Sequence, residues 1–324
     1  MRSVTCAALC LTATLAAIPG AQAQQYPARQ VRVIVPFAAG GTPDVVARVI
    51  TQQLSNQTGR AFVVENRPGA DGVVGSQAVA ESAPDGYTLL VTSSSFVVNP
   101  SFHKTMPFNA IRDFEPVTNI AATEAYIVGI YPGVMARTVQ EFIALARQPD
   151  SKISFGSPGV GNGLHLAAEL FKSLTKTNMV HVPYRGAAGA LTGLMAGDVQ
   201  FMFMTPPSSM AYVEAGKIRP LAYAGTKRFS RLPNVPTLAE AGVPGMEVLS
   251  SWTGMFAPAR TPPDVLARLH EEVKKAVDSP FGRERLTGLG VLPIANPPAE
   301  FKPYIAAQVS QIAEIVKTAG IEPH

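Results

Sequence analysis

The sequence predicts an α/β protein of two lobes joined by two crossing segments. The chain has 324 residues, more than one hydrophobic core usually supports, so two domains are the default expectation. Strand-like and helix-like patterns alternate twice, before and after a long, mostly apolar stretch of strand type at 113–131. A second stretch, 247–256, carries the only tryptophan, Trp252, and is predicted to lead the chain back to the first lobe.

The first 23 residues have the pattern of a secretory signal peptide. After a basic start, residues 4–18 form an apolar segment too short for a stable bilayer anchor, and residues 21–23 (AQA) form an A-x-A cleavage motif. Both cysteines, Cys6 and Cys10, lie inside this segment. A mature chain would therefore have no disulfide and no thiolate chemistry, and we expect a soluble, exported protein.

The charge pattern argues against nucleic-acid binding. The formal net charge is +4, and the basic residues are scattered, with Lys274 and Lys275 the nearest approach to a cluster. A mild positive balance is compatible with a small acidic ligand, although the signal is weak.

The first strand, loop and helix form a candidate anion site. Residues 31–35 are a β-branched run typical of a buried strand, Pro36 ends it, and residues 38–41 (AAGG) form a loop. Thr42 is predicted to cap the next helix, with Pro43 as its first residue. Backbone N–H groups then converge at the positive end of a helix dipole, which suits a carboxylate. An ordinary βα turn is the alternative.

The first lobe continues with the same alternation. Strands are predicted at 61–65 and 88–91, with a short helix at 73–81 between them. The second of these strands runs into Ser93 and Ser94, at the strand end where ligands bind in open α/β sheets. A solvated loop is the alternative interpretation of this hydroxyl run.

The second lobe is predicted to repeat this order. Its helices are expected at 138–147, 164–172 and 190–196, and its strands at 152–155, 179–183, 199–204 and 217–224. The loop at 156–163 could be mistaken for a dinucleotide fingerprint. However, Leu164 replaces the third glycine and no acid ends the next strand, so an anion-binding loop with donors from Ser157 and Asn162 is preferred.

A later segment echoes the first loop. Residues 182–189 (VPYRGAAG) repeat the order strand, proline, aromatic residue, small residues and helix of residues 35–40. We interpret the two segments as equivalent loops that face the cleft from the two lobes. Arg185 would either pair bidentately with a ligand carboxylate or lie at the cleft rim. The strand at 199–204 leads into Thr205, and an extended connector at 232–237 leads into a short helix.

The C-terminal third is predicted to be helical. Helices are expected at 263–277, 281–289 and 300–317, with a brief strand at 291–294.

Several segments together resemble a known family of receptors. They are VPFAAGGTPDVVAR (35–48), ENRPGADGVVGSQAVAESAPDGYTLL (65–90), GSPGVGNGLHLAAELF (156–171), VPYRG (182–186), GKIRPLA (216–222) and LPNVPTLAEAGVPG (232–245). With the SW-x-G-x-x-AP segment at 251–258, they cover the chain from about residue 26 to residue 321. In this order they resemble the Bug-type (TctC-like) periplasmic solute-binding receptors of tripartite tricarboxylate transporters.

The resemblance implies a two-lobed, type II periplasmic binding protein fold with two crossing strands and a ligand cleft between the lobes. One lobe would comprise residues 24–122 and 248–324, and the other residues 123–247. It further implies a periplasmic receptor that binds a small carboxylate and serves membrane permease subunits. From the A-x-A motif we expect cleavage before Gln24, and we expect the mature protein to be a monomer. No cofactor and no metal are expected.

The resemblance also assigns the site. The carboxylate would meet the loop at 37–44 directly or through water, and the loops at 157–165 and 184–186 from the other lobe. The expected ligand-binding residues are Phe37, Ala38, Ala39, Gly41, Thr42, Asp44, Ser93, Ser94, Ser157, Gly159, Asn162, His165, Tyr184, Arg185 and Thr205.

Two acidic positions bear on the ligand's charge. Asp44 is expected to complement the helix dipole and to order the loop, because direct contact with an anion would be repulsive. Family members often carry an aspartate just after the strand matching residues 201–203, where this chain has Met204, Thr205 and Pro206. That departure argues against a ligand with an ammonium group.

Enzyme chemistry has weaker support. No G-x-S-x-G elbow occurs. His165 and Glu169 share a helix face, but no third metal ligand is apparent. His165 is better interpreted as a hydrogen-bonding residue at a helix start than as a catalytic base. The alternatives to a transport receptor are an exported enzyme acting on carboxylates and a receptor that presents its ligand to a sensor kinase.

Overall fold

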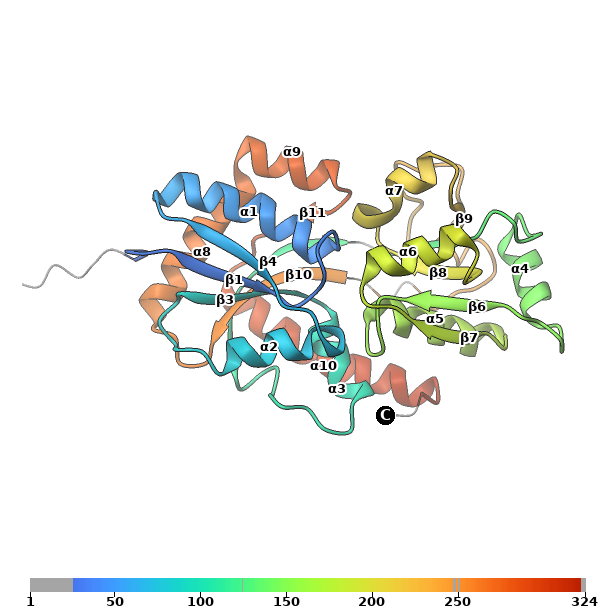
Figure 1. The fold of residues 1–324 in the computed structure, drawn as a ribbon, viewed down its shortest axis with the longest axis horizontal. Coiled ribbons are helices and arrows are strands. Elements are labelled where there is room, and N and C mark those ends of the chain that lie inside the picture. The colour runs from blue at the N-terminus through green and yellow to red at the C-terminus, as the bar shows by residue number, and fades with distance from the viewer. Residues whose placement is uncertain (1–25, 124, 247–248, 250, 322–324) are drawn as a thin grey trace, which may run out of the picture.

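Two α/β lobes lie side by side along the long axis of the molecule (Figure 1). The computed structural model describes residues 26–321 apart from 124, 247–248 and 250. The predicted signal peptide and its cleavage site lie outside the described residues. No helix in the described part of the chain is both long and apolar enough to cross a membrane.

The first lobe is built on a six-stranded sheet of order β11-β4-β10-β3-β1-β2. Its strands are β1 (Val31–Val35), β2 (Phe62–Asn66), β3 (Thr88–Ser93), β4 (Phe114–Thr123), β10 (Ser251–Pro258) and β11 (Leu292–Pro293). Its helices are α1 (Thr42–Thr58), the short 3-10 helix η1 (Ala70–Gly72), α2 (Val73–Ala80), α3 (Ser95–Phe102), α8 (Pro263–Asp278), α9 (Pro280–Gly288) and α10 (Pro298–Thr318).

The second lobe is built on a five-stranded sheet of order β7-β6-β8-β5-β9. Its strands are β5 (Ile127–Ile130), β6 (Ser154–Ser157), β7 (Val180–Pro183), β8 (Phe201–Met204) and β9 (Arg219–Tyr223). Its helices are α4 (Val139–Ala146), α5 (Gly163–Thr175), α6 (Ala187–Ala196) and α7 (Pro206–Glu214).

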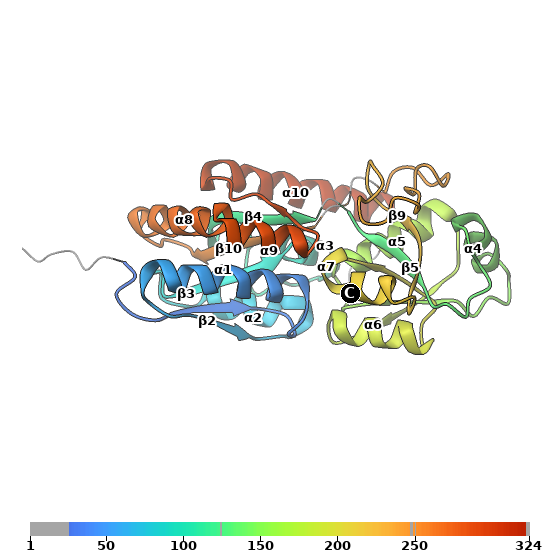
Figure 2. The ribbon, with the colours of Figure 1, turned by 90° about the horizontal axis from the view of Figure 1, so that it is seen from above.

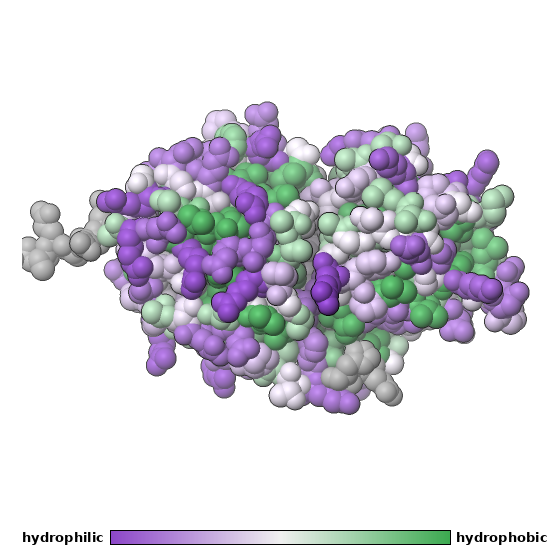
Figure 3. Space-filling model, viewed as in Figure 1, coloured by the Kyte–Doolittle hydropathy of each residue, from purple (hydrophilic) through white to green (hydrophobic). Residues whose placement is uncertain are grey.

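Both sheets follow one plan. Three parallel strands, β2-β1-β3 in one lobe and β7-β6-β8 in the other, are followed by an antiparallel strand, β10 or β5. This is the predicted type II topology. It brings the carboxyl ends of the parallel strands of both lobes to the line where the lobes meet, which Figure 3 shows as a furrow.

The two predicted crossing segments are present. β4 of the first sheet leads, within a few residues, to β5 of the second, and the chain returns to enter the first sheet as β10. β4 and β10 pair antiparallel, with Ser251 opposite Thr123. The two crossings are therefore neighbours. The exact lobe boundaries at 122/123 and 247/248 stay a prediction.

The first sheet is covered on both faces, which explains its continuous apolar strands. Val33 and Val35 of β1 pack into a core shared with α1 and α8, whereas Ile34 points into the core on the opposite face. The last helix, α10, packs against α3 and β4 and also reaches α5 of the second lobe. Figure 2 shows α10 along one side of the molecule.

Two local predictions were wrong, and two helices were not predicted. The cap of α1 is Gly41, not Thr42, because the Thr42 hydroxyl bonds to Thr205 instead of to its own helix. Helices α3 and α7 were not predicted. α3 is short and contains Pro100, and α7 follows a Thr-Pro pair that resembles the start of α1. The short helix expected after residue 237 is a series of turns among the described residues.

Candidate functional site

Two adjacent cavities lie where the lobes meet. The inner chamber has a volume of about 60 Å³, and the outer chamber a volume of about 580 Å³. They share the lining residues Phe37, Ala38, Pro158 and Gly186. The inner volume suits a carboxylate or a few water molecules, and the outer volume is typical of a site for a small organic molecule.

The N-terminal ends of five helices line the inner chamber. The cap residues are Gly41 of α1, Ser94 of α3, Asn162 of α5, Gly186 of α6 and Thr205 of α7. Each end carries backbone N–H groups and partial positive charge. Among the described residues, no acidic or basic side chain lines this chamber. The chamber is therefore electropositive without a formal charge, which suits a carboxylate.

Several donors are available to an anion there. Ala38, Gly41 and Thr42 line the chamber, and their backbone N–H groups donate no hydrogen bond to any residue that the structure describes. The side chain of Tyr126 is buried beside them, and burial raises the pKa of its hydroxyl to about 12, although hydrogen bonds with Ser94 and Ser251 act to lower it. The hydroxyl of Tyr126 therefore keeps its proton at neutral pH and can donate it in a hydrogen bond.

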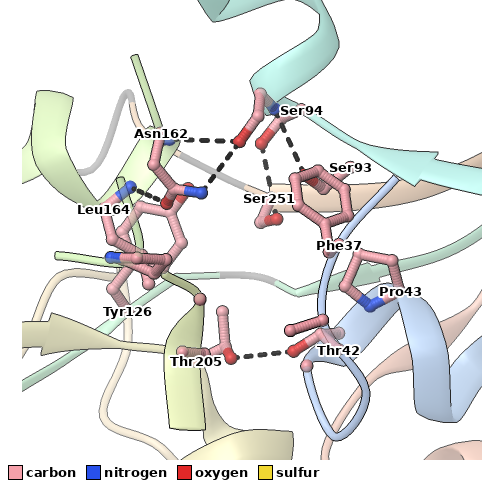
Figure 4. A pocket seen from close by; sticks show the side chains of 17 residues that line it. Phe37, Thr42, Pro43, Ser93, Ser94, Tyr126, Asn162, Leu164, Thr205 and Ser251 are labelled. Atoms are coloured by element: carbon pink, nitrogen blue, oxygen red, sulfur yellow. Dashed lines mark hydrogen bonds between the residues drawn. The ribbon is translucent and has the colours of Figure 1, made fainter. Parts of the chain in front are cut away.

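Hydrogen bonds between the lobes close the inner chamber on two sides (Figure 4). On one side, the hydroxyls of Thr42 and Thr205 share a bond of 2.8 Å. On the other, Asn162 Nδ2 donates to Asp71 Oδ1 at 2.9 Å and to Ser95 Oγ at 3.1 Å. Asn162 also caps α5, because its Oδ1 accepts from the N–H of Leu164 at 2.9 Å. The lobes are therefore closed on each other.

The loop before α1 is held from behind by Asp44. Its carboxylate accepts from Gly40 N at 2.9 Å, from Asn66 Nδ2 at 2.9 Å and from Arg48 Nε at 3.1 Å. Burial acts to raise the pKa of Asp44, but the hydrogen bonds from Arg48, Gly40 and Asn66 together hold it below its usual value. Gly40 has φ +85°, so the left-handed position of the turn is Gly40 and not Gly41, whose φ is −76°.

We expect Asp44→Asn to lower stability by about 1–2 kcal/mol at pH 7 and by far less at pH 3. Because the pKa of Asp44 is lowered in the folded state, its carboxylate stabilises the fold at pH values above its unfolded-state pKa, which is near 4. This stabilisation is lost as the pH falls through the folded-state pKa. Urea denaturation at the two pH values measures this. An equal loss at both would show that the charge of Asp44 does not hold the loop.

The structure separates the predicted site residues into three groups. Those that line the inner chamber are Phe37, Ala38, Gly41, Thr42, Ser93, Ser94, Asn162 and Thr205. Those that line the outer chamber are Phe37, Ala38, Gly159, Tyr184 and Arg185. Those that line neither chamber are Ala39, Asp44, Ser157 and His165.

Ser157 and His165 shape the glycine-rich loop instead of facing the chambers. Ser157 Oγ accepts from Gly159 N at 3.3 Å and bonds to His181 Nε2 at 2.7 Å. His165 Nδ1 accepts from Gly161 N at 3.3 Å, and its ring stacks on that of His181 with centroids 3.9 Å apart. His165 thus has the geometry of a hydrogen-bonding residue at a helix start.

Asp71, which was not among the expected site residues, lines the outer chamber. Asp71 has φ +46° and follows Ala70 at φ +43°, in the glycine-rich turn beyond β2. That turn, at the carboxyl end of a strand, was the available signal. Burial raises the pKa of Asp71 to about 7, although hydrogen bonds from Asn162 and Ser95 lower it.

We expect Asp71→Asn to stabilise the unliganded protein at pH 8 by about 2–4 kcal/mol and to have little effect at pH 4. A carboxyl whose folded pKa lies above its unfolded value stabilises the fold at low pH, and that contribution is lost as pH rises through 7. Denaturation at pH 4 and pH 8 measures this. A gain of similar size at both would assign it to packing.

The architecture and the site together are those of a two-lobed, type II periplasmic binding protein. Residues 46–321 match the family described as "Tripartite tricarboxylate transporter family receptor". The protein BugT of Bordetella pertussis is 33% identical over 300 residues, which cover 92% of this chain and 91% of BugT. The chain belongs to this family of receptors.

Solved structures of similar proteins agree in fold. R. palustris Rpa4515, solved with adipate, is 35% identical with a TM-score of 0.88, and the match covers 92% of this chain and all of that chain. MatC from Rhodopseudomonas palustris, solved with bound malate, is 30% identical with a TM-score of 0.85 over 90% of this chain and all of its own. Both are structures of carboxylate complexes.

Proposed function

We propose that this protein is an exported receptor that captures a small organic carboxylate between its lobes and delivers it to the permease subunits of a tripartite tricarboxylate transporter. The observation that carries the proposal is the inner chamber, where five helix N-termini converge and no described charged side chain intervenes. An uncharged lining of N–H and hydroxyl donors favours a carboxylate over a cation or an apolar group.

In this proposal the ligand's carboxylate occupies the inner chamber and its remaining atoms extend into the outer one. The donors would be the backbone at Ala38, Gly41 and Thr42, the hydroxyl of Tyr126 and the amide of Asn162. The outer chamber adds apolar surface from Phe37 and Pro158. The carboxylates in the two solved relatives, adipate and malate, support this ligand class.

Thermal denaturation with a panel of organic acids tests the proposal. At one hundred times the dissociation constant, a ligand adds about 2.7 kcal/mol of stability. We expect at least one small acid to stabilise the protein clearly, with calorimetry giving one site per chain. Stabilisation by amines or sugars, but by no acid, would overturn the proposal. Turnover of a bound acid, followed by NMR, would favour the alternative of an exported enzyme.

The proposed export makes a prediction about the N-terminus. Because the A-x-A motif precedes Gln24, we expect the mature chain from the periplasm to begin at Gln24 and to carry no lipid. Intact-mass spectrometry of protein released from the periplasm measures this. A mass that includes Cys6, or a diacylglycerol adduct, would contradict it.

The partner is tested by transport. Deleting the receptor gene should abolish uptake of the acid that it binds, and a plasmid copy should restore it. Normal uptake, together with loss of an acid-induced transcriptional response, would instead favour a receptor that serves a sensor kinase.

A further inference from the structure

Asp71 lines the outer chamber, and one of its carboxyl oxygens is buried without a hydrogen-bond partner among the described residues. Asp71 Oδ1 accepts from Asn162 Nδ2, but Asp71 Oδ2 is shielded from solvent and has no hydrogen-bond partner among the described residues. A buried acceptor without a donor is costly, and such groups are usually satisfied by water or by a ligand. Asp71 lines the larger chamber, so a rotation of its side chain would turn Oδ2 toward a ligand there, which can supply the missing donor.

We propose that Asp71 is a specificity-determining residue that accepts a hydrogen bond from the far end of the ligand, so that the site favours carboxylates carrying a hydroxyl or ammonium group over dicarboxylates. This inference rests on the proposed function, because it takes the ligand's carboxylate to lie in the inner chamber. It also revises the expectation, drawn from the absence of an aspartate at 204–206, that the ligand has no ammonium group. Asp71, in the other lobe, is an acidic residue that can face such a group.

The charges around the outer chamber support this preference. The other titratable side chains that line it are His103, Tyr184 and Arg185. Arg185 is exposed and forms no ion pair with another described residue, so solvent and salt screen its charge. Asp71 is desolvated, and a charge in such surroundings acts more strongly on its neighbours. For a second carboxylate in the chamber, the repulsion by ionised Asp71 is therefore stronger than the attraction by Arg185.

A dicarboxylate can still bind if one proton is taken up with it. Two carboxylates in one desolvated site do not both stay ionised, so a proton from the buffer would be shared between Asp71 Oδ2 and the ligand. Because burial raises the pKa of Asp71 to about 7, this proton is bound before the ligand arrives at lower pH and has to be taken up at higher pH.

Four six-carbon acids that differ only at the far end test the proposal: hexanoate, 6-hydroxyhexanoate, 6-aminohexanoate and adipate. By calorimetry at pH 8, we expect the hydroxy and amino acids to bind the wild-type protein at least tenfold more tightly than adipate. The affinity for adipate should fall about tenfold for each pH unit above 7, with uptake of one proton measured in buffers of different ionisation enthalpy.

Asp71→Asn is the decisive variant, because it keeps the shape and replaces the acceptor in the chamber with a donor. Its Oδ1 can still accept from Asn162, so closure is retained. We expect the order of affinities to reverse, with adipate bound more tightly than 6-aminohexanoate and without proton uptake. Asp264→Asn, in the first turn of α8, makes the same change of charge far from the cleft and should leave the order unchanged.

The outcomes separate this inference from the proposed function. If no acid of the wider panel binds, the proposed function and the role of Asp71 are both overturned. If adipate binds wild-type protein as tightly as the hydroxy and amino acids, only the role of Asp71 is overturned. If Asp71→Asn leaves the order of affinities unchanged, the role of Asp71 is overturned too. If adipate binds most tightly and Arg185→Ala removes that preference, the far end is recognised by the arginine instead.

Discussion

Replacing Gly163 with alanine is expected to weaken carboxylate binding at least a hundredfold while leaving the fold intact. A Cβ atom at Gly163 would lie 3.0 Å from Tyr126 Oη and 3.4 Å from Ser94 Oγ, inside a chamber of only about 60 Å³. The new methyl group would take space that the anion needs and push the hydroxyls of Tyr126 and Ser94 aside. A hundredfold loss corresponds to about 2.8 kcal/mol, in the range of a lost charge-assisted hydrogen bond.

Calorimetry with the best acid from the panel measures the loss, and Gly189→Ala is the matched control. Gly189 lies in α6, and a Cβ atom there would meet only the Tyr184 side chain at an ordinary distance of 3.8 Å. Both glycines are helical and neither has a positive φ, so alanine suits the backbone in each case. Wild-type affinity in Gly163→Ala would mean that the carboxylate lies elsewhere.

Asn162→Asp is expected to reduce affinity by a similar factor at pH 8 and to recover part of it below pH 6. Aspartate caps a helix as well as asparagine does, so α5 should persist. However, the donor shared by Asp71 Oδ1 and Ser95 Oγ would be lost. Two carboxylates would then face each other in a buried site that also has to hold an anion, and a shared proton at low pH relieves this repulsion.

The control for this variant is Thr138→Asp. Thr138 caps α4 on an exposed part of the second lobe, where its Oγ1 accepts a hydrogen bond from Glu141 N. The change introduces the same charge at the same kind of position, far from the chambers. Affinity measured against pH should follow the wild-type protein in Thr138→Asp. A parallel decline in both variants would assign the effect to net charge.

The elements that the sequence predicts well are those with strong local signals. The β-branched run at 31–35, Pro36 and the Gly40–Gly41 turn define β1, its end and the start of α1 without tertiary information. α3 has no such signal, since a hydroxyl run and Pro100 suggest a loop. α7 had the Thr205–Pro206 start, which is the same chemistry as Thr42–Pro43 and could have been recognised.

The site could be predicted only in part, because its chemistry depends on closure. The loops that carry Gly41 and Asn162 were predicted from glycine content and helix starts. Asp71 was not, since its burial comes from residues distant in sequence: Asn162 is 91 positions away. Asp44 and His165 were expected among the ligand-binding residues but line neither chamber, and they instead have the loop-supporting roles that were also expected of them.

The five helix ends around the inner chamber are divided between two bodies. α1 and α3 belong to the first lobe, and α5, α6 and α7 to the second, so separating the lobes splits the anion site into two incomplete halves. Each half alone would hold a carboxylate weakly. Tight binding arises when a carboxylate held by one half also meets the donors of the other half at high local concentration. A membrane partner that separates the lobes would thus release the ligand. It would need neither a competing binding site for the ligand nor the protonation of a side chain.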